Sequence, residues 1–175
     1  MKKCLLIIFL LLIISLPVLA QSSNDPSQYF KSYLDNGDLS IYASIGYFWG
    51  ICANAGAELV LGQWNIANIV PIDYSIGARI LFESWSFLGY SETYFGAAPM
   101  FIVHLGLAGN FDFYEGIGLG FAFYSGNQYS NANFELGFAA LSGIAWYLSK
   151  NLGLIIEYAY IGWTSTWGVG VTLKI

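Results

Sequence analysis

Charged residues are scarce in this chain of 175 residues. Asp, Glu, Lys and Arg together make up 10% of it, and apolar residues make up 57%. An ordinary soluble domain carries roughly 25% charged residues. Because so few charges cannot cover a surface that faces water, the sequence predicts a protein surrounded by an apolar medium.

Basic residues and cysteines are scarcer still. Removal of residues 1–20, discussed below, leaves 4 basic residues against 11 acidic ones, a balance of −7, which argues against nucleic acid as a partner. The chain has two cysteines, Cys4 and Cys52. Since Cys4 lies in the removed segment, no intrachain disulfide can form, and the single remaining thiol is expected to have a packing role.

Residues 1–20 have the pattern of a signal peptide. Lys2 and Lys3 precede an apolar run over 5–16, and Val18 and Ala20 occupy the −3 and −1 positions before residue 21. The alternative is a membrane anchor helix, but the run is short for a span and the polar segment 21–27 follows it at once. We therefore predict a cleaved signal peptide and an exported mature chain.

Long helical runs are lacking, although uncharged windows exist. The windows 39–57 and 116–134 are crowded with Gly, Ser, Asn, Tyr and Phe, and their apolar residues recur with a period of two. In 167–175, Trp, Val, Val, Leu and Ile share one face, while Gly, Gly, Thr and Lys share the other. A soluble sandwich would carry charges on its outer face, whereas here most charges share the narrower face with the glycines. This pattern is typical of a transmembrane β-barrel.

Turn signals divide residues 39–175 into eight strands. An even number of strands places both chain ends on the periplasmic side, as bacterial barrels require. The sequence therefore predicts an all-β fold, an eight-stranded antiparallel up-and-down transmembrane barrel. Short turns are expected at Gly109-Asn110 and Ser149-Lys150-Asn151. The expected strands are 39–48, 54–63, 72–83, 94–108, 111–124, 134–148, 152–163 and 166–175.

Residues 21–38 form a periplasmic leader before the first strand. Within it, 25–37 has a helix start at Asp25-Pro26 and a stop at Asn36-Gly37, with four apolar residues on one side. Two interpretations stay open, a disordered leader and a short amphipathic helix at the membrane interface or against the barrel mouth.

The six tryptophans fall near strand ends in this topology, where aromatic side chains favour the two membrane interfaces. Four are expected near the outer ends and two near the inner turns. The outer set is Trp49, Trp85, Trp163 and Trp167, and the inner set is Trp64 and Trp146.

Three segments resemble the small OmpA/OmpX-like outer-membrane barrels. Residues 143–158 are similar to the last periplasmic turn of that family, and 114–120 to its glycine-alternating fifth strand. The closing strand is similar to the C-terminal signal read by the outer-membrane barrel assembly machinery, with Ile175 in place of the usual Phe. The resemblance implies a Gram-negative outer membrane, its lipid and that machinery as partners. Because the family includes structural proteins, adhesins, small pores and lipid-modifying enzymes, it implies no single function.

Charged residues on the inward faces could form a cluster in the lumen. We expect them to be paired, because small barrels fill their interior with side chains. The catalytic alternative would use His104 as a general base, but the His-x-Ser arrangement of lipid A deacylases is absent, since residue 106 is Gly. We predict no catalytic residue, no metal and no cofactor. The inward set is Glu58, Arg79, Glu83, His104, Glu135, Glu157 and Lys174.

Two residues break the pattern. Strict alternation turns Glu115 outward, where a carboxylate is costly in lipid, so we expect an interfacial position or a local bulge there. Pro99 falls inside the fourth strand, where it removes a ladder hydrogen bond. It predicts either a bulge near the outer rim or a lateral weak point that admits a small apolar ligand.

These observations favour a non-enzymatic outer-membrane barrel with a filled lumen and a structural or surface-interaction role. The outer connections are expected to be short, the longest near 84–93 and 125–133, which weakens an adhesin interpretation. The alternative is a narrow channel or lateral conduit for small hydrophobic molecules.

Overall fold

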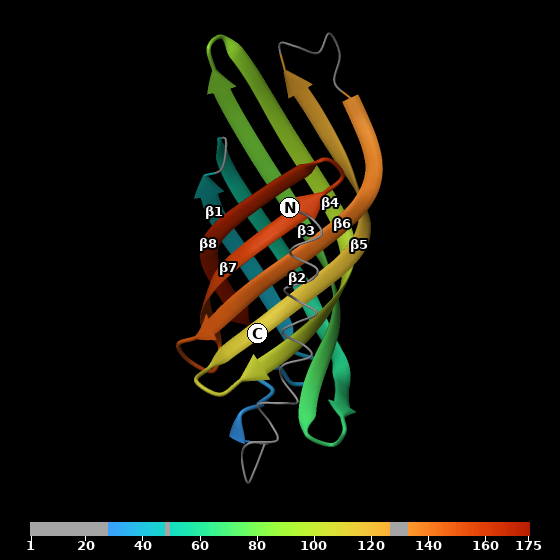
Figure 1. The fold of residues 1–175 in the computed structure, drawn as a ribbon, viewed down its shortest axis with the longest axis vertical. Coiled ribbons are helices and arrows are strands. Elements are labelled where there is room, and N and C mark those ends of the chain that lie inside the picture. The colour runs from blue at the N-terminus through green and yellow to red at the C-terminus, as the bar shows by residue number, and fades with distance from the viewer. Residues whose placement is uncertain (1–27, 48–49, 127–132) are drawn as a thin grey trace.

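The computed structural model describes residues 28–47, 50–126 and 133–175. Its eight antiparallel strands pair in sequence order and β1 closes on β8, so the expected eight-stranded barrel is confirmed (Figure 1). The strands are β1 Leu39–Tyr47, β2 Ile51–Ile66, β3 Val70–Phe87, β4 Tyr90–Leu107, β5 Phe111–Gly126, β6 Asn133–Tyr147, β7 Leu152–Ile161 and β8 Thr164–Lys174. The predicted signal peptide lies outside the described residues.

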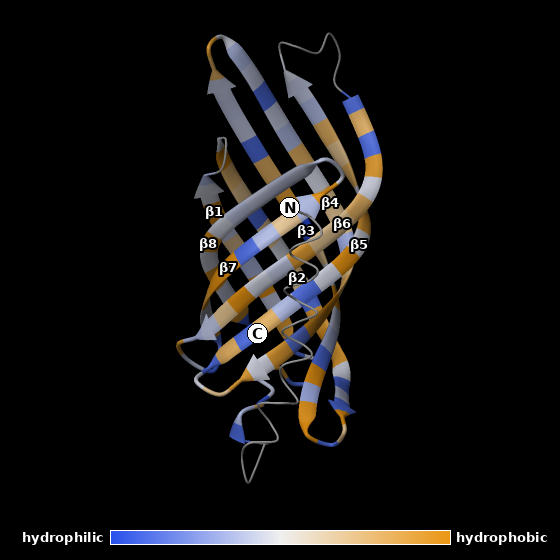
Figure 2. Cartoon of the chain, viewed as in Figure 1, coloured by the Kyte–Doolittle hydropathy of each residue, from blue (hydrophilic) through white to orange (hydrophobic). Residues whose placement is uncertain are grey.

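The period of two in the sequence becomes an inside and an outside wall. Along β7, Leu154 and Ile156 are exposed while Ile155 and Glu157 between and after them are buried. Polar and apolar residues alternate in the same way along other strands (Figure 2). Because successive side chains of a strand point to opposite faces, this alternation gives an apolar outer wall and a filled interior.

Two tight turns join the longest strands. Ala67 and Asn68 between β2 and β3 have φ of 53° and 58°, and Leu88 and Gly89 between β3 and β4 have φ of 49° and 84°. Two successive residues of positive φ match the twist of a β-hairpin. The connection near 84–93, expected to be among the longest of the short outer connections, is instead a two-residue turn, because β3 and β4 stay paired up to it.

The barrel wall is uneven in height. The β3–β4 hairpin and the ends of β5 and β6 rise above the β7–β8 turn (Figure 1). The pairing of β6 with β7 ends at Ala139 and Ile161. Among the described residues, the outer part of β6 over 134–137 therefore pairs with β5 on one side and with no strand on the other.

The leader closes the periplasmic mouth instead of forming a helix over its described part, 28–38. It adds to the end of β4, since the backbone N–H of Lys31 donates to Gly106 O at 3.0 Å and that of Ala108 donates to Tyr29 O at 2.9 Å. Phe30 and Leu34 are buried. In the part of the chain that is described, no helix is long and apolar enough to cross a membrane.

A bulge in β2 receives the end of the leader. The register between β2 and β3 shifts between Val60 and Gly62. There the N–H of Val60 donates to Asp38 O, and the N–H of Gly37 donates to Val60 O, both at 2.9 Å. The leader is thus bonded both to β4 and to β2, and it crosses the mouth between them.

Candidate functional site

Five charged side chains from five strands meet in the lumen. Arg79 of β3 lies 3.6 Å from Glu58 of β2 and 3.3 Å from Glu157 of β7. His104 of β4 lies 3.0 Å from Glu58 through Nε2, and its Nδ1 lies 2.9 Å from Asp112 of β5. All five are at most 2% exposed. Inward alternation explains the convergence, because it aims each residue at the barrel axis.

Aromatic side chains complete this lumen cluster. The hydroxyl of Tyr42 donates to Glu58, and that of Tyr114 donates to Glu157 at 3.2 Å. The Arg79 guanidinium carbon lies 4.1 Å from the centre of the Tyr42 ring, a cation–π distance. Each buried charge therefore has an ion-pair partner, although Glu58 Oε2, Arg79 Nη2 and Asp112 Oδ1 form no hydrogen bond among the described residues.

The other three expected members of the cluster lie elsewhere. Glu83 is in the outer half of the lumen and accepts a hydrogen bond from Thr164 at 3.1 Å. Glu135 is half-buried and accepts one from the Trp163 indole. Lys174 lies at the periplasmic mouth. Alternation along each strand predicted that these residues face inward. It could not predict their height in the barrel, because the register between strands decides which residues lie at the same level.

The sequence prediction missed four inward-facing residues of the lower lumen, although the alternation along their strands places them on the inward face. Asp112 and Tyr114 share the face of the inward glycines of β5, and Asp73 shares the face of Arg79. Tyr42 lies on the serine face of β1. Asp73 accepts hydrogen bonds from Ser32 at 2.5 Å and from Gln63 at 2.9 Å, which ties the leader to the barrel wall.

A serine does lie near His104, contrary to what the sequence suggested. Ser75 Oγ on the neighbouring strand is 3.5 Å from His104 Nε2, and Asp112 is on the other ring nitrogen. Sequence spacing along β4 could not reveal it, because Ser75 belongs to β3. The same Nε2 is nearer to Glu58, and Ser75 is fully buried. A substrate therefore has no access to this hydroxyl.

The outer half of the lumen holds a layer of apolar side chains beside buried polar ones, such as Asn54, which donates to Ser44 at 3.2 Å and accepts from Thr166 at 2.5 Å. Leu81, Ala98, Ala139 and Ile161 are each at most 1% exposed. A Cβ added at Gly96 would lie 3.2 Å from Ile161 and 3.3 Å from Leu81. This apolar layer lies above the lumen cluster and narrows the interior there.

Pro99 interrupts the barrel wall without a bulge. Its pairing with Ala78 on β3 is intact, whereas the β4–β5 pairing passes from Ala97–Phe121 directly to Met100–Gly118. The register is the same on both sides of this gap, and the gap lies in the middle of β4. The expected bulge near the outer rim was therefore wrong.

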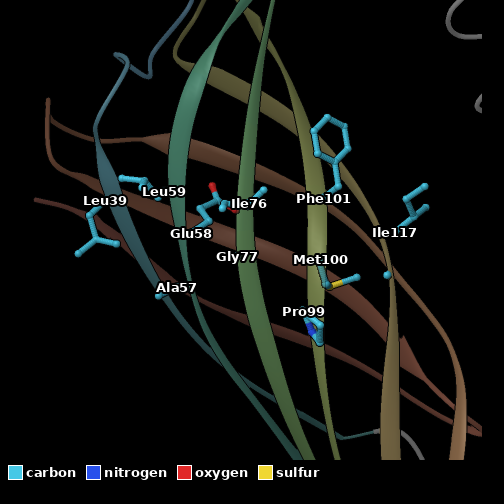
Figure 3. Close-up of a pocket in the computed structure, with 11 residues that line it drawn as sticks. Leu39, Ala57, Glu58, Leu59, Ile76, Gly77, Pro99, Met100, Phe101 and Ile117 are labelled. Atoms are coloured by element: carbon cyan, nitrogen blue, oxygen red, sulfur yellow. The ribbon is translucent and has the colours of Figure 1, made fainter.

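The ring of Pro99 is exposed on the lipid-facing wall. Beside it lies an open depression of about 670 Å³ that reaches from β1 to β5 and is lined mainly by apolar side chains (Figure 3). Met100, the next residue, points inward and is 4% exposed. A lateral passage at Pro99 stays a prediction. In this structure, buried side chains lie on the lumen side of the depression.

Glu115 faces outward and is half-buried. It accepts a hydrogen bond from Ser142 Oγ at 2.7 Å, its pair on β6. The β5–β6 register is continuous here, so no bulge relieves the carboxylate on that side. The hydrogen bond offsets part of the cost of its position.

The described tryptophans lie near strand ends. Trp64 stacks on Tyr74 with ring centres 4.5 Å apart, and Trp146 stacks on Phe111 at 6.2 Å. These pairs are at the periplasmic ends of their strands. Trp85, Trp163 and Trp167 are near the outer ends, and Trp49 lies outside the described residues. Their level relative to a bilayer stays a prediction.

Comparison with known proteins gives the fold. No protein-family model and no curated protein matches the sequence. Among solved structures, the chain is similar to Ail, the attachment invasion locus protein of Yersinia pestis, with a TM-score of 0.53 and 14% identity over 81% of this chain and 100% of Ail. Neisserial surface protein A matches with a TM-score of 0.49 and 15% identity, over 79% of this chain and 94% of that protein. The outer membrane enzyme PagL matches with a TM-score of 0.42 and 17% identity, over 79% of this chain and 98% of PagL.

At these identities the likeness establishes the fold. It confirms the resemblance to small OmpA/OmpX-like barrels at that level. The eight strands form a closed barrel, and its outer face is apolar. Since only such a barrel or a helix spans lipid, the fold and its apolar outer wall are together those of a barrel that spans a membrane.

Proposed function

We propose that this outer-membrane barrel has no catalytic activity and acts at the cell surface through its raised β3–β6 wall. The observation that carries the proposal is the apolar tip of the β3–β4 hairpin. Phe87, Leu88 and Tyr90 are 67%, 81% and 50% exposed. Leu88 also has a φ of 49°, a conformation that costs a leucine roughly 1–2 kcal/mol. An exposed leucine in a strained turn favours a role in contact with a partner.

The outer part of β6 supports the same role. Phe134, Leu136 and Phe138 are 56%, 73% and 53% exposed. Over 134–137 the backbone forms a sheet edge among the described residues, and such an edge can add an extended strand of a partner. The raised wall thus offers both apolar side chains and backbone hydrogen-bonding groups.

The test uses intact cells and an apolar surface. Cells that produce the wild-type protein should be retained on an octyl-coated surface more strongly than cells that produce Phe87→Ser with Leu88→Asn and Tyr90→Ser. Leu148→Asn is the matched control, because Leu148 is also half-exposed but lies in a periplasmic turn. Equal retention of the wild type and the tip variant at equal surface abundance would contradict the proposal.

The channel or conduit is the weaker alternative, since the lumen cluster and the apolar layer fill the interior. Refolded protein in a planar bilayer should give no reproducible single-channel steps. Conductance steps, or a hydrophobic ligand that copurifies and is lost on Met100→Trp, would favour the alternative.

The absence of catalysis rests on the burial of Ser75 and on the closer contact of His104 with Glu58. Lipid A and phospholipid substrates incubated with the refolded barrel should release no fatty acid. Release that disappears in Ser75→Ala would establish a hydrolase instead.

Recognition of β8 by the assembly machinery is part of the same proposal. Its apolar face, Trp167, Val169, Val171 and Leu173, is exposed and alternates with small or polar residues. Replacement of Ile175 by Phe should leave assembly intact or improve it, and charge on the Val171 face should block insertion.

A further inference from the structure

Three of the four basic residues of 21–175 line one polar pocket at the periplasmic mouth. Its volume is about 390 Å³, and it lies between the leader, the β4–β5 turn and the β6–β7 turn. Lys31 comes from the leader, Lys150 from the β6–β7 turn and Lys174 from the end of β8. In a chain of net charge −5, this convergence of ammonium groups is unexpected.

Two of these lysines lack an acidic partner. Lys174 Nζ lies 2.9 Å from Asp38 and donates to Tyr33 O at 2.8 Å. Within the ranges 28–47, 50–126 and 133–175, neither Lys31 nor Lys150 forms an ion pair. Asp35 is the one carboxylate that lines the pocket, so the lining has an excess of positive charge.

The walls of the pocket are held in place. Tyr33 and Tyr147 stack with ring centres 5.5 Å apart, and Lys31 Nζ lies 5.3 Å from the Tyr33 ring centre. The Tyr33 hydroxyl donates to Leu107 O at 2.7 Å and accepts from the N–H of Asn110 at 3.0 Å. The Tyr147 side chain is 3% exposed, and its hydroxyl has no hydrogen-bond partner among the described residues. The aromatic wall of the pocket and Lys174 are therefore held in place, while Lys31 and Lys150 are exposed at its rim.

We propose that this pocket, the lysine pocket, binds a phosphate group on the periplasmic side of the membrane. Lysine ammonium groups bind phosphate as point charges, and three of them around one polar pocket suit a tetrahedral anion better than a single carboxylate. A phospholipid headgroup of the inner leaflet and a free phosphate present the same chemistry. The site is independent of the raised outer wall, and its failure would leave the proposed function untouched.

Binding is measured with two probes on protein refolded in maltoside micelles. Inorganic phosphate is titrated at constant ionic strength, and short-chain phosphatidylglycerol is titrated separately, with calorimetry as the readout. The Lys31→Gln, Lys150→Gln double variant should lose about tenfold or more in affinity, since two attractive charges are removed. Asp35→Asn is the matched control of opposite sign and should bind about threefold more tightly.

The outcomes separate the ligand sources. Saturable binding of phosphatidylglycerol alone assigns the pocket to a lipid headgroup, and binding of phosphate alone assigns it to a soluble anion. The proposal is overturned if neither probe saturates, or if the double lysine variant binds like the wild type while its urea unfolding midpoint is unchanged.

Discussion

The two ends of the barrel are held by different means. At the periplasmic end, ion pairs, hydrogen bonds and the leader fix the interior, and three lysines gather at the mouth. At the outer end, apolar side chains share the lumen with uncharged hydrogen-bonded groups such as Asn54 and Thr166, and the wall is uneven in height. The difference indicates that ion pairs specify one arrangement in the lower half, while the upper half, with its uneven rim, leaves a surface free for contact.

The largest expected effect tests the polar half. Arg79→Met should lower the free energy of unfolding by about 3–5 kcal/mol, because it leaves two buried carboxylates without their cation. Urea unfolding followed by tryptophan fluorescence measures it. Adding Glu58→Gln and Glu157→Gln to Arg79→Met should restore much of the loss. If the single variant matches the wild type, the lumen cluster does not stabilise the fold.

The next effect tests the apolar layer of the outer half. Ile161→Ala should lower the free energy of unfolding by about 3 kcal/mol, because it opens a cavity against Leu81 and the neighbouring glycines. Ile161→Val should cost about 1 kcal/mol in the same unfolding measurement. Equal losses for both variants would mean that the apolar layer is loosely packed.

A smaller effect tests the attachment of the leader. Tyr33→Phe removes the hydrogen bond to Leu107 O and the acceptor for Asn110, so about 1–2 kcal/mol of local stability should be lost. Amide hydrogen exchange over residues 29–35 should rise while exchange in β7 stays unchanged. Unchanged exchange in the leader would show that its backbone bonds to β4 suffice.

The smallest expected effect is a gain in stability, at the tip of the β3–β4 hairpin. Leu88→Gly should raise the free energy of unfolding by about 1 kcal/mol, since glycine adopts positive φ without strain. Gly89→Ala, at φ 84°, should lower it. A destabilised Leu88→Gly would indicate that this leucine packs against the barrel instead of projecting from it.

Alternation was sufficient to predict the barrel, the number of strands and most strand ends, because burial on one face imposes a period of two. It also predicted that Glu58, Arg79, His104 and Glu157 face inward. It could not predict how high each residue lies along the barrel axis, because the register between strands decides which residues of different strands come into contact. Glu83 and Lys174 face the lumen, as Arg79 does, yet they lie at opposite ends of it.

Contacts between distant segments account for the other misses. Ser75 contacts His104 from β3, on one side of β4, and Asp112 contacts the other ring nitrogen of His104 from β5, on the other side. The path of the leader was left open by the sequence for a similar reason. Its residues carry a weak helical pattern, but backbone groups of β4 and β2 offer it hydrogen bonds that an isolated segment lacks. Strand length at 84–93 was underestimated because a two-residue turn needs only Leu88 and Gly89.

The path of the leader has a consequence for the order of biogenesis. This segment is made before any strand, yet its partners include Asp73, Gly106 and Lys174, and the last of these belongs to β8. Its full set of contacts can form only after β1 has met β8 and the cylinder is shut. Protection of the leader from a protease would therefore mark the moment of closure, and a barrel stalled in assembly would be cut there first.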